Sequence, residues 1–148
     1  MANLTGGQIV NASSEKVWKL MMDTDALARI TPGVTQLIKL DEENYTAIAD
    51  VRIGPVHGKF SGTLKMTNVK EPESFTLALQ QNSQIGNANA VVNMHIKPLS
   101  ETQSDVTFTG DVKLSGMLNT MGMRVITPVS NMLAKQFFTA LEKEAEVL

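Results

Sequence analysis

The feature of this sequence that most constrains its fold is an alternation of apolar and polar residues through the middle of the chain. In residues 60–66 the even positions are apolar or glycine, and the odd positions are polar. The same period of two recurs in residues 75–79, 88–96 and 106–114. Such alternation is typical of antiparallel strands that bury one face and leave the other in water.

Short polar segments, or segments with Gly or Pro, separate these runs. They are residues 41–44, Gly54-Pro55, 71–73 and 100–103. Because such segments favour tight turns, we expect six consecutive strands to form an antiparallel meander.

The N-terminal part predicts one strand and two short helices. The strand covers about residues 3–10, and Ser13 is a good N-cap for a helix over residues 14–22. A second helix over residues 24–30 should end before Pro32, because proline disfavours helical geometry in the residue before it.

From Met117 the apolar residues fall at three- and four-residue steps, which predicts a helix. About 30 residues at 1.5 Å each give roughly 45 Å, enough to cross a sheet whose strands are about 35 Å long. Pro128 lies inside this segment and should kink it, or separate a shorter segment at about residues 117–126.

This order of elements predicts an α+β fold of the helix-grip type. A curved seven-stranded antiparallel sheet would surround a long C-terminal helix, with two short helices after the first strand. The chain of 148 residues contains no linker or repeat, so we expect a single domain over residues 1–148.

Composition excludes several classes of function. The sequence has no cysteine, which excludes disulfides, thiolate metal sites and cysteine nucleophiles. Its net charge is −2 without long basic blocks, so we expect no nucleic-acid partner. It also lacks a signal peptide or an apolar run of about 18 residues, which favours a cytoplasmic protein. Nine methionines suit an adaptable apolar surface.

Several short motifs resemble one family. They are Val17-Trp18 with Asp23, residues 30–34 (ITPGV), residues 54–62 (GPVHGKFSG), Gly122-Met123-Arg124 and Phe137-Phe138. Together they resemble the CoxG family, which is named for the G subunit of carbon monoxide dehydrogenase and belongs to the START-like, or SRPBCC, superfamily. The resemblance covers nearly the whole chain.

The resemblance implies a deep apolar cavity and a non-catalytic accessory role without a cofactor. Family members are similar to factors that bring a molybdenum-containing CO dehydrogenase, or a related hydroxylase, to the membrane by handling a quinone-like lipid. Longer members carry a C-terminal apolar anchor, whereas this sequence ends at Leu148. We therefore expect transient, peripheral contact with the inner face of the membrane.

The expected ligand is an apolar small molecule, a quinone or a lipid, held between sheet and helix. The expected lining residues are Leu27, Ile30, Pro32, Val51, Phe60, Leu64, Leu79, Ala90, Val92, Met94, Phe108, Met117, Leu118, Met121, Val125, Val129 and Met132. The expected rim consists of His57, Met123 and Arg124. Methionine at helical spacing is also typical of an ordinary packed core, and Arg124 is equally explained as an exposed residue.

We predict no catalytic residue and no metal site. His57 and His95 do not converge with each other or with a serine, and titratable residues in the clear strand runs fall on the outward parity. Two alternatives remain: a small enzyme of the cyclase or hydrolase kind, and a protein-interaction module like the co-chaperones of the superfamily. An enzyme would need a general acid or base that projects into the cavity.

Access to the cavity should require movement. The sequence suggests a mobile apolar gate, hinged at Thr127-Pro128, with Arg124 at its rim. The expected gate residues are Leu27, Ile30, Pro32, Met117, Met121 and Met123.

Overall fold

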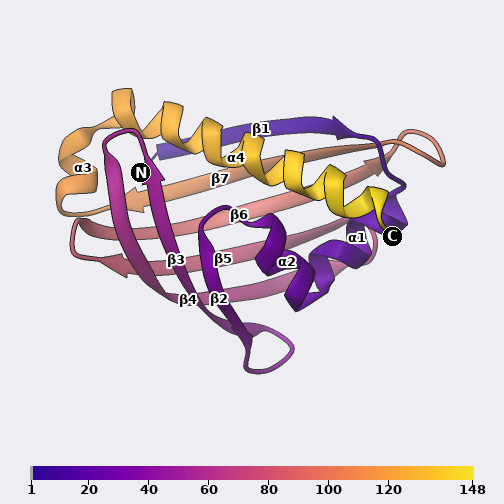
Figure 1. Cartoon of the computed structure of the whole chain (residues 1–148), viewed down its shortest axis with the longest axis horizontal. Coiled ribbons are helices and arrows are strands. Elements are labelled where there is room, and N and C mark those ends of the chain that lie inside the picture. Colours follow the sequence, from indigo (N-terminus) through magenta and orange to yellow (C-terminus); the bar gives the residue numbers. More distant parts are fainter. Residues whose placement is uncertain (1) are drawn as a thin grey trace.

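The structure is a computed structural model that describes residues 2–148, and Figure 1 shows its arrangement. The elements follow the order β1 (Ala2–Val10), α1 (Ser14–Met22), α2 (Thr24–Ile30), β2 (Val34–Lys39), β3 (Asn44–Ile53), β4 (Val56–Lys70), β5 (Ser74–Ser83), β6 (Gly86–Pro98), β7 (Ser104–Leu114), α3 (Met117–Met121) and α4 (Met123–Glu146). The predicted α+β fold is confirmed, with a seven-stranded antiparallel sheet and a long C-terminal helix.

The strands form one sheet in the order β1-β7-β6-β5-β4-β3-β2. Strands β2 to β7 pair with their sequence neighbours, as the short turns predict, and β1 closes the far edge against β7. The register is continuous through the middle of the sheet, so residues of one face align in rows across it.

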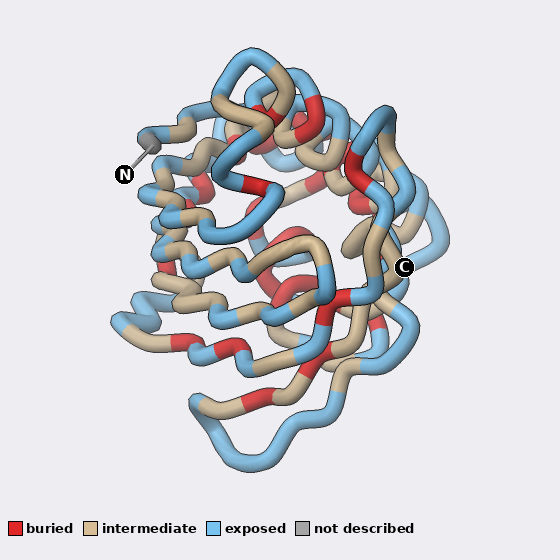
Figure 2. Tube along the Cα trace, turned by 90° about the vertical axis from the view of Figure 1, so that its left-hand side faces the viewer, coloured by how far each residue is buried: buried red, intermediate tan, exposed pale blue. Residues whose placement is uncertain are grey.

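The helices lie on one face of this sheet. In Figure 1, α4 runs across the sheet from α3 at one end to the C-terminus at the other, and α1 and α2 lie beside its C-terminal half. Residues on the sheet face beneath α4 alternate with residues on the convex face, and Figure 2 shows this alternation of burial along the strands. We call the face beneath α4 the concave face.

Local signals explain the N-terminal helices. The Ser13 hydroxyl accepts a hydrogen bond from the Lys16 N–H at 3.2 Å, which caps α1. The Asp23 carboxylate accepts hydrogen bonds from the N–H groups of Asp25 and Ala26, which caps α2. Both helices have the predicted bounds because these caps are encoded in a few adjacent residues.

The C-terminal helical region differs from the prediction in its point of division. A separate short segment exists, but it ends at Met121, and α4 continues through Pro128. The division lies at Gly122, whose φ of +74° is a left-handed conformation that favours glycine. Pro128 therefore removes one backbone hydrogen-bond donor within α4 without ending the helix.

Candidate functional site

Buried apolar residues form two separate clusters on the concave face. The larger cluster joins α1, α2 and the C-terminal half of α4 to one end of the sheet. In this cluster, Trp18 packs edge-on against Phe75, with 5.7 Å between the ring centroids. The smaller cluster joins α3 and the N-terminal half of α4 to Val56 and Phe60. The two halves of α4 thus cover opposite ends of the sheet.

A row of four residues crosses strands β3 to β6 between these clusters. Ala47 pairs with Gly62, Gly62 with Gln81, and Gln81 with Ala88. We call Ala47, Gly62, Gln81 and Ala88 the central row. None of the four belongs to either cluster.

Side chains near the central row remain half-buried although they face α4. Leu79, Ala90 and Val92 lie on central strands β5 and β6, and each is only partly covered. Side chains on the concave face of central strands reach solvent only between sheet and helix. The candidate site is therefore an apolar, solvent-accessible surface on the concave face, between the two clusters.

This surface carries little charge. The charged residues on strands β3 to β7, including Asp50, Lys59, Lys65 and Asp111, alternate with the inward residues and lie on the convex side. Among residues 2–148, no group of three or more potential metal ligands comes together. An uncharged apolar surface suits a neutral apolar ligand, because an isolated charge is costly to bring out of water.

The groups with shifted pKa values lie elsewhere. Hydrogen bonds from Arg29 lower the pKa of Glu144 where α2 meets α4. The backbone N–H of Glu43, together with the side chain and N–H of Asn44, lowers the pKa of Asp41 in the β2–β3 turn. Both shifts result from hydrogen bonds away from the concave face.

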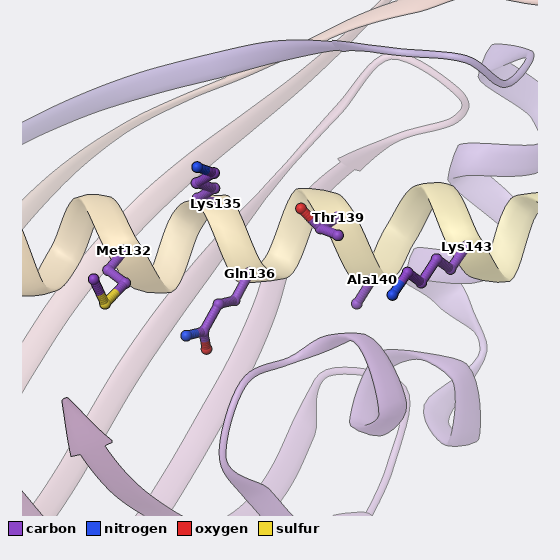
Figure 3. A pocket seen from close by; sticks show the side chains of 6 residues that line it. All are labelled: Met132, Lys135, Gln136, Thr139, Ala140 and Lys143. Carbon is purple, nitrogen blue, oxygen red and sulfur yellow. The ribbon is translucent and has the colours of Figure 1, made fainter.

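Two grooves lie on the outer surface. One, of about 460 Å³, follows the outer flank of α4 and is lined by Met132, Lys135, Gln136, Thr139, Ala140 and Lys143 (Figure 3). The other, of about 550 Å³, is lined by residues of α1 and the β4–β5 turn, including Trp18 and Pro72. Neither groove is the space between sheet and helix that the sequence predicts.

The predicted lining residues fall into four groups. Phe60, Leu118 and Val129 are buried in the smaller cluster, and Val51, Met121 and Val125 pack against it. Leu27, Ile30, Leu64 and Met94 are buried in the larger cluster, and Leu79, Val92 and Phe108 pack against that one. Ala90 and Pro32 are half-buried outside both clusters. Met117 and Met132 are 57% and 51% exposed.

The exposure of Met132 corrects the helical phase predicted from sequence. Both Met132 and Leu133 continue the apolar spacing from Val129, and the structure turns Leu133 toward the smaller cluster. Met132 consequently lies on the outer flank of α4, in the groove of Figure 3. Met117 is exposed at the first residue of α3, whereas Leu118 is buried.

The predicted gate and rim do not form one unit in this structure. Leu27 and Ile30 are buried in the larger cluster, while Met121 packs against the smaller one. His57 is exposed at the β3–β4 hairpin, and Met123 and Arg124 are exposed in the first turn of α4. These residues belong to different ends of α4 because the chain enters α2 beside the helix C-terminus.

Sequence reasoning missed two polar side chains of the concave face. Gln81 has the inward parity of Phe75, Leu77 and Leu79. It was missed because it lies after the clear apolar run and is not a charged residue. Tyr45 is the second residue of β3 and is 3% exposed, packed in the larger cluster. Extending the parity of β5 by one more step would have found Gln81.

The family model for CoxG, the G subunit of carbon monoxide dehydrogenase, matches residues 6–146. The chain belongs to the CoxG family. A search of curated proteins finds no significant match to this CoxG-family chain. In the residues that the structure describes, no helix is long and apolar enough to span a membrane.

Solved structures agree with this CoxG assignment at the level of the fold. A conserved protein from Geobacillus kaustophilus is 25% identical, with a TM-score of 0.94 over 98% of this chain and 95% of that one. A START superfamily protein from Mycobacterium smegmatis is 15% identical, with a TM-score of 0.79 and 97% of each chain covered. The Zhui aromatase/cyclase from Streptomyces sp. R1128 is 12% identical, with a TM-score of 0.74 over 98% of this chain and 93% of that one. The START-like, helix-grip fold is thereby shown.

Proposed function

We propose that this CoxG-family chain binds a neutral apolar molecule, a quinone or a quinone-like lipid, between α4 and the concave face of the sheet. The observation that carries the proposal is the half-buried apolar surface between two core clusters. A folded chain normally covers such a surface, since interiors are close-packed. A bound ligand would complete the packing between the two clusters.

The role that this binding serves is accessory. The family takes its name from carbon monoxide dehydrogenase, which supports a partnership with such an enzyme, and we propose a molybdenum-containing enzyme of that type. The chain would deliver its ligand between that enzyme and the inner face of the membrane. Exposed Met117 and Met123, next to the cationic Arg124, support a transient contact with the membrane surface.

An enzyme of the cyclase kind is the alternative that the fold allows. Its chemistry would require a general acid or base facing the ligand. The polar side chains of β3–β7 that face inward are Tyr45, Gln81, Ser83 and Ser104. None of them is a histidine, a carboxylate or a lysine, and Tyr45 is packed in the larger cluster, which supports binding over acid–base catalysis.

The test replaces a small residue of the sheet by a large one that would fill the proposed site. Ala90 is half-buried on the concave side of β6, so Ala90→Phe should occupy space that the ligand needs. We expect the affinity for a decyl-substituted methylnaphthoquinone to fall at least tenfold, while the urea midpoint of unfolding changes little. Quenching of Trp18, the single tryptophan, by the bound quinone measures the affinity.

Val91→Phe is the matched control, because Val91 is the next residue and is 47% exposed on the convex face. It should leave both affinity and stability unchanged. Absence of quinone binding by the unmodified protein contradicts the proposal. Equal losses of stability and binding in Ala90→Phe would show a tightly packed core instead.

A further inference from the structure

Gln81 is a polar side chain in the middle of an otherwise small and apolar row. It lies on β5 between Gly62 of β4 and Ala88 of β6, and Ala47 follows Gly62 in the same row. Leu79, two residues earlier, shares its face. The amide is therefore placed where the two core clusters leave the concave face half-covered.

The hydrogen-bonding capacity of Gln81 is almost unused. Its Nε2 donates to the Thr63 carbonyl at 3.5 Å, which is longer than the usual 2.9–3.0 Å of a good N–H···O bond. By contrast, the Ser83 hydroxyl donates to the Gly86 carbonyl at 2.6 Å, and the Ser104 hydroxyl donates to the Ala12 carbonyl at 2.7 Å. Hydrogen bonds within the fold thus account for both serine hydroxyls, whereas they leave most of the hydrogen-bonding capacity of the Gln81 amide unused.

The neighbours of Gln81 in the central row are all small. Gly62 has no side chain, and Ala47 and Ala88 carry only a methyl group. A Cβ added at Gly62 would collide with the backbone carbonyl of Gln80, so the backbone itself holds this position small. Ala47 is buried, whereas Gly62 and Ala88 are only partly covered, so a flat ring would lie over Gly62 and Ala88 beside the amide.

The surroundings also determine which oxygen chemistry fits. An amide N–H group is a hydrogen-bond donor for a carbonyl or hydroxyl oxygen. The nearest charged residues along the strands, Lys59 and Lys65, are on the convex face. A carboxylate would therefore reach the concave face without a counter-ion, whereas a neutral carbonyl needs only the amide.

We propose that Gln81 is the specificity-determining residue of the concave face, donating a hydrogen bond from Nε2 to a neutral carbonyl oxygen on the ring of an apolar ligand. This inference rests on the proposed function and adds the residue that recognises the ring carbonyl of the ligand, which would favour a quinone over a hydrocarbon or a fatty acid. Apolar pockets commonly fix their ligands by a few such polar groups.

The experiment compares three probes by equilibrium dialysis. They are the decyl-substituted methylnaphthoquinone, the decyl-substituted methylnaphthalene of the same carbon skeleton, and hexadecanoate. We expect Gln81→Leu to weaken quinone binding roughly three- to tenfold, the effect of one neutral hydrogen bond. Binding of the naphthalene should stay the same or tighten, since leucine replaces an amide by an apolar group. Hexadecanoate should bind more weakly than the quinone to the unmodified protein.

Gln80→Leu provides the matched control. Gln80 is the adjacent glutamine, exposed on the convex face, so the same substitution there should leave quinone affinity unchanged. A spectroscopic readout separates a direct contact from a structural effect: the infrared carbonyl stretch of bound, isotope-labelled quinone should shift to higher frequency in Gln81→Leu. Loss of a hydrogen bond at the carbonyl has this effect.

The outcomes distinguish this inference from the proposed function. Quinone binding that is equal in Gln81→Leu and the unmodified protein overturns the role of Gln81 and leaves the carrier function standing. Equal weakening of quinone and naphthalene binding in Gln81→Leu shows a packing effect and also overturns it. If neither ring compound binds the unmodified protein, the proposed function itself fails. Preference for hexadecanoate over the quinone overturns the ligand class.

Discussion

Gly33 fastens the turn between α2 and β2 to the neighbouring strand β3. Its carbonyl accepts a hydrogen bond from the Asp50 N–H at 2.8 Å, and its φ is +78°. A Cβ at this position would lie 2.6 Å from the Asp50 carbonyl oxygen. Gly54 also has a positive φ, of +55°, but an added Cβ there would meet no atom within 4 Å. An alanine at Gly54 would suffer backbone strain alone, whereas an alanine at Gly33 would suffer both backbone strain and a steric collision.

We expect Gly33→Ala to destabilise the protein more than Gly54→Ala. Gly54→Ala adds only the strain of a left-handed alanine, about 1–2 kcal/mol. Gly33→Ala adds the collision with Asp50 and should lower the free energy of unfolding by about 3 kcal/mol or more. Urea denaturation of both variants measures the difference, and equal losses would show that the turn relaxes away from β3.

Residue-scale details of the site were only partly predictable. The parity of Phe60, Leu64 and Met94 follows from alternation alone, and all three are buried as expected. The choice of Leu133 over Met132 could not be read from spacing, because both residues continue the same apolar pattern. Which of them turns inward depends on the start of α4 at Met123, after the division at Gly122.

An ion pair joins α2 to the C-terminal part of α4. The Arg29 guanidinium donates from Nε to Glu144 Oε1 at 2.8 Å and from Nη2 to Oε2 at 3.2 Å. These hydrogen bonds lower the pKa of Glu144 from its ordinary value of 4.5 and raise that of Arg29. The pair adds a surface contact to the apolar packing of α2 within the larger cluster.

The ion pair predicts a pH-dependent contribution to stability. Since folding lowers the pKa of Glu144, its contribution is present above 4.5 and is lost as the pH falls through the folded-state pKa. Glu144→Gln should therefore be less stable than the unmodified protein at pH 7, and the difference should vanish in acid. The effect should be small, because Arg29 is exposed.

Thermal unfolding at several pH values measures this difference. Glu146→Gln serves as the control, because Glu146 is an exposed glutamate of α4 outside the ion pairs found in residues 2–148. A difference between Glu144→Gln and the unmodified protein that persists unchanged in acid would contradict the role of the ion pair.

The elements themselves were predicted well because their signals are local. Ser13 and Asp23 cap α1 and α2, and polar turns set the ends of the strands. The division of the last helix was placed too late because Pro128 is a stronger sequence signal than Gly122. Proline removes only one hydrogen bond here, whereas a left-handed glycine changes the direction of the chain.

At the scale of the whole molecule, the proposed ligand links two clusters that otherwise have no common member. Binding to the folded state alone raises stability, by about 2.7 kcal/mol at a hundredfold excess over Kd. We expect the naphthoquinone to raise the midpoint of thermal unfolding by several degrees in one cooperative transition. A midpoint that does not move at saturating quinone contradicts binding to the folded chain.

The pairing of β1 with β7 sets the order in which this fold can be completed during synthesis. Ala2 pairs with Val112 and Val10 with Ser104, so the first strand leaves the ribosome roughly one hundred residues before its partner. At about 5–20 residues per second, it waits for about 5–20 seconds. The meander β2–β7 can pair as it emerges, but its concave face has no α4 above it until translation is nearly finished. The nascent chain therefore presents an uncovered apolar sheet and a free strand until its last residues are made, and this is the stage at which it is most exposed to aggregation.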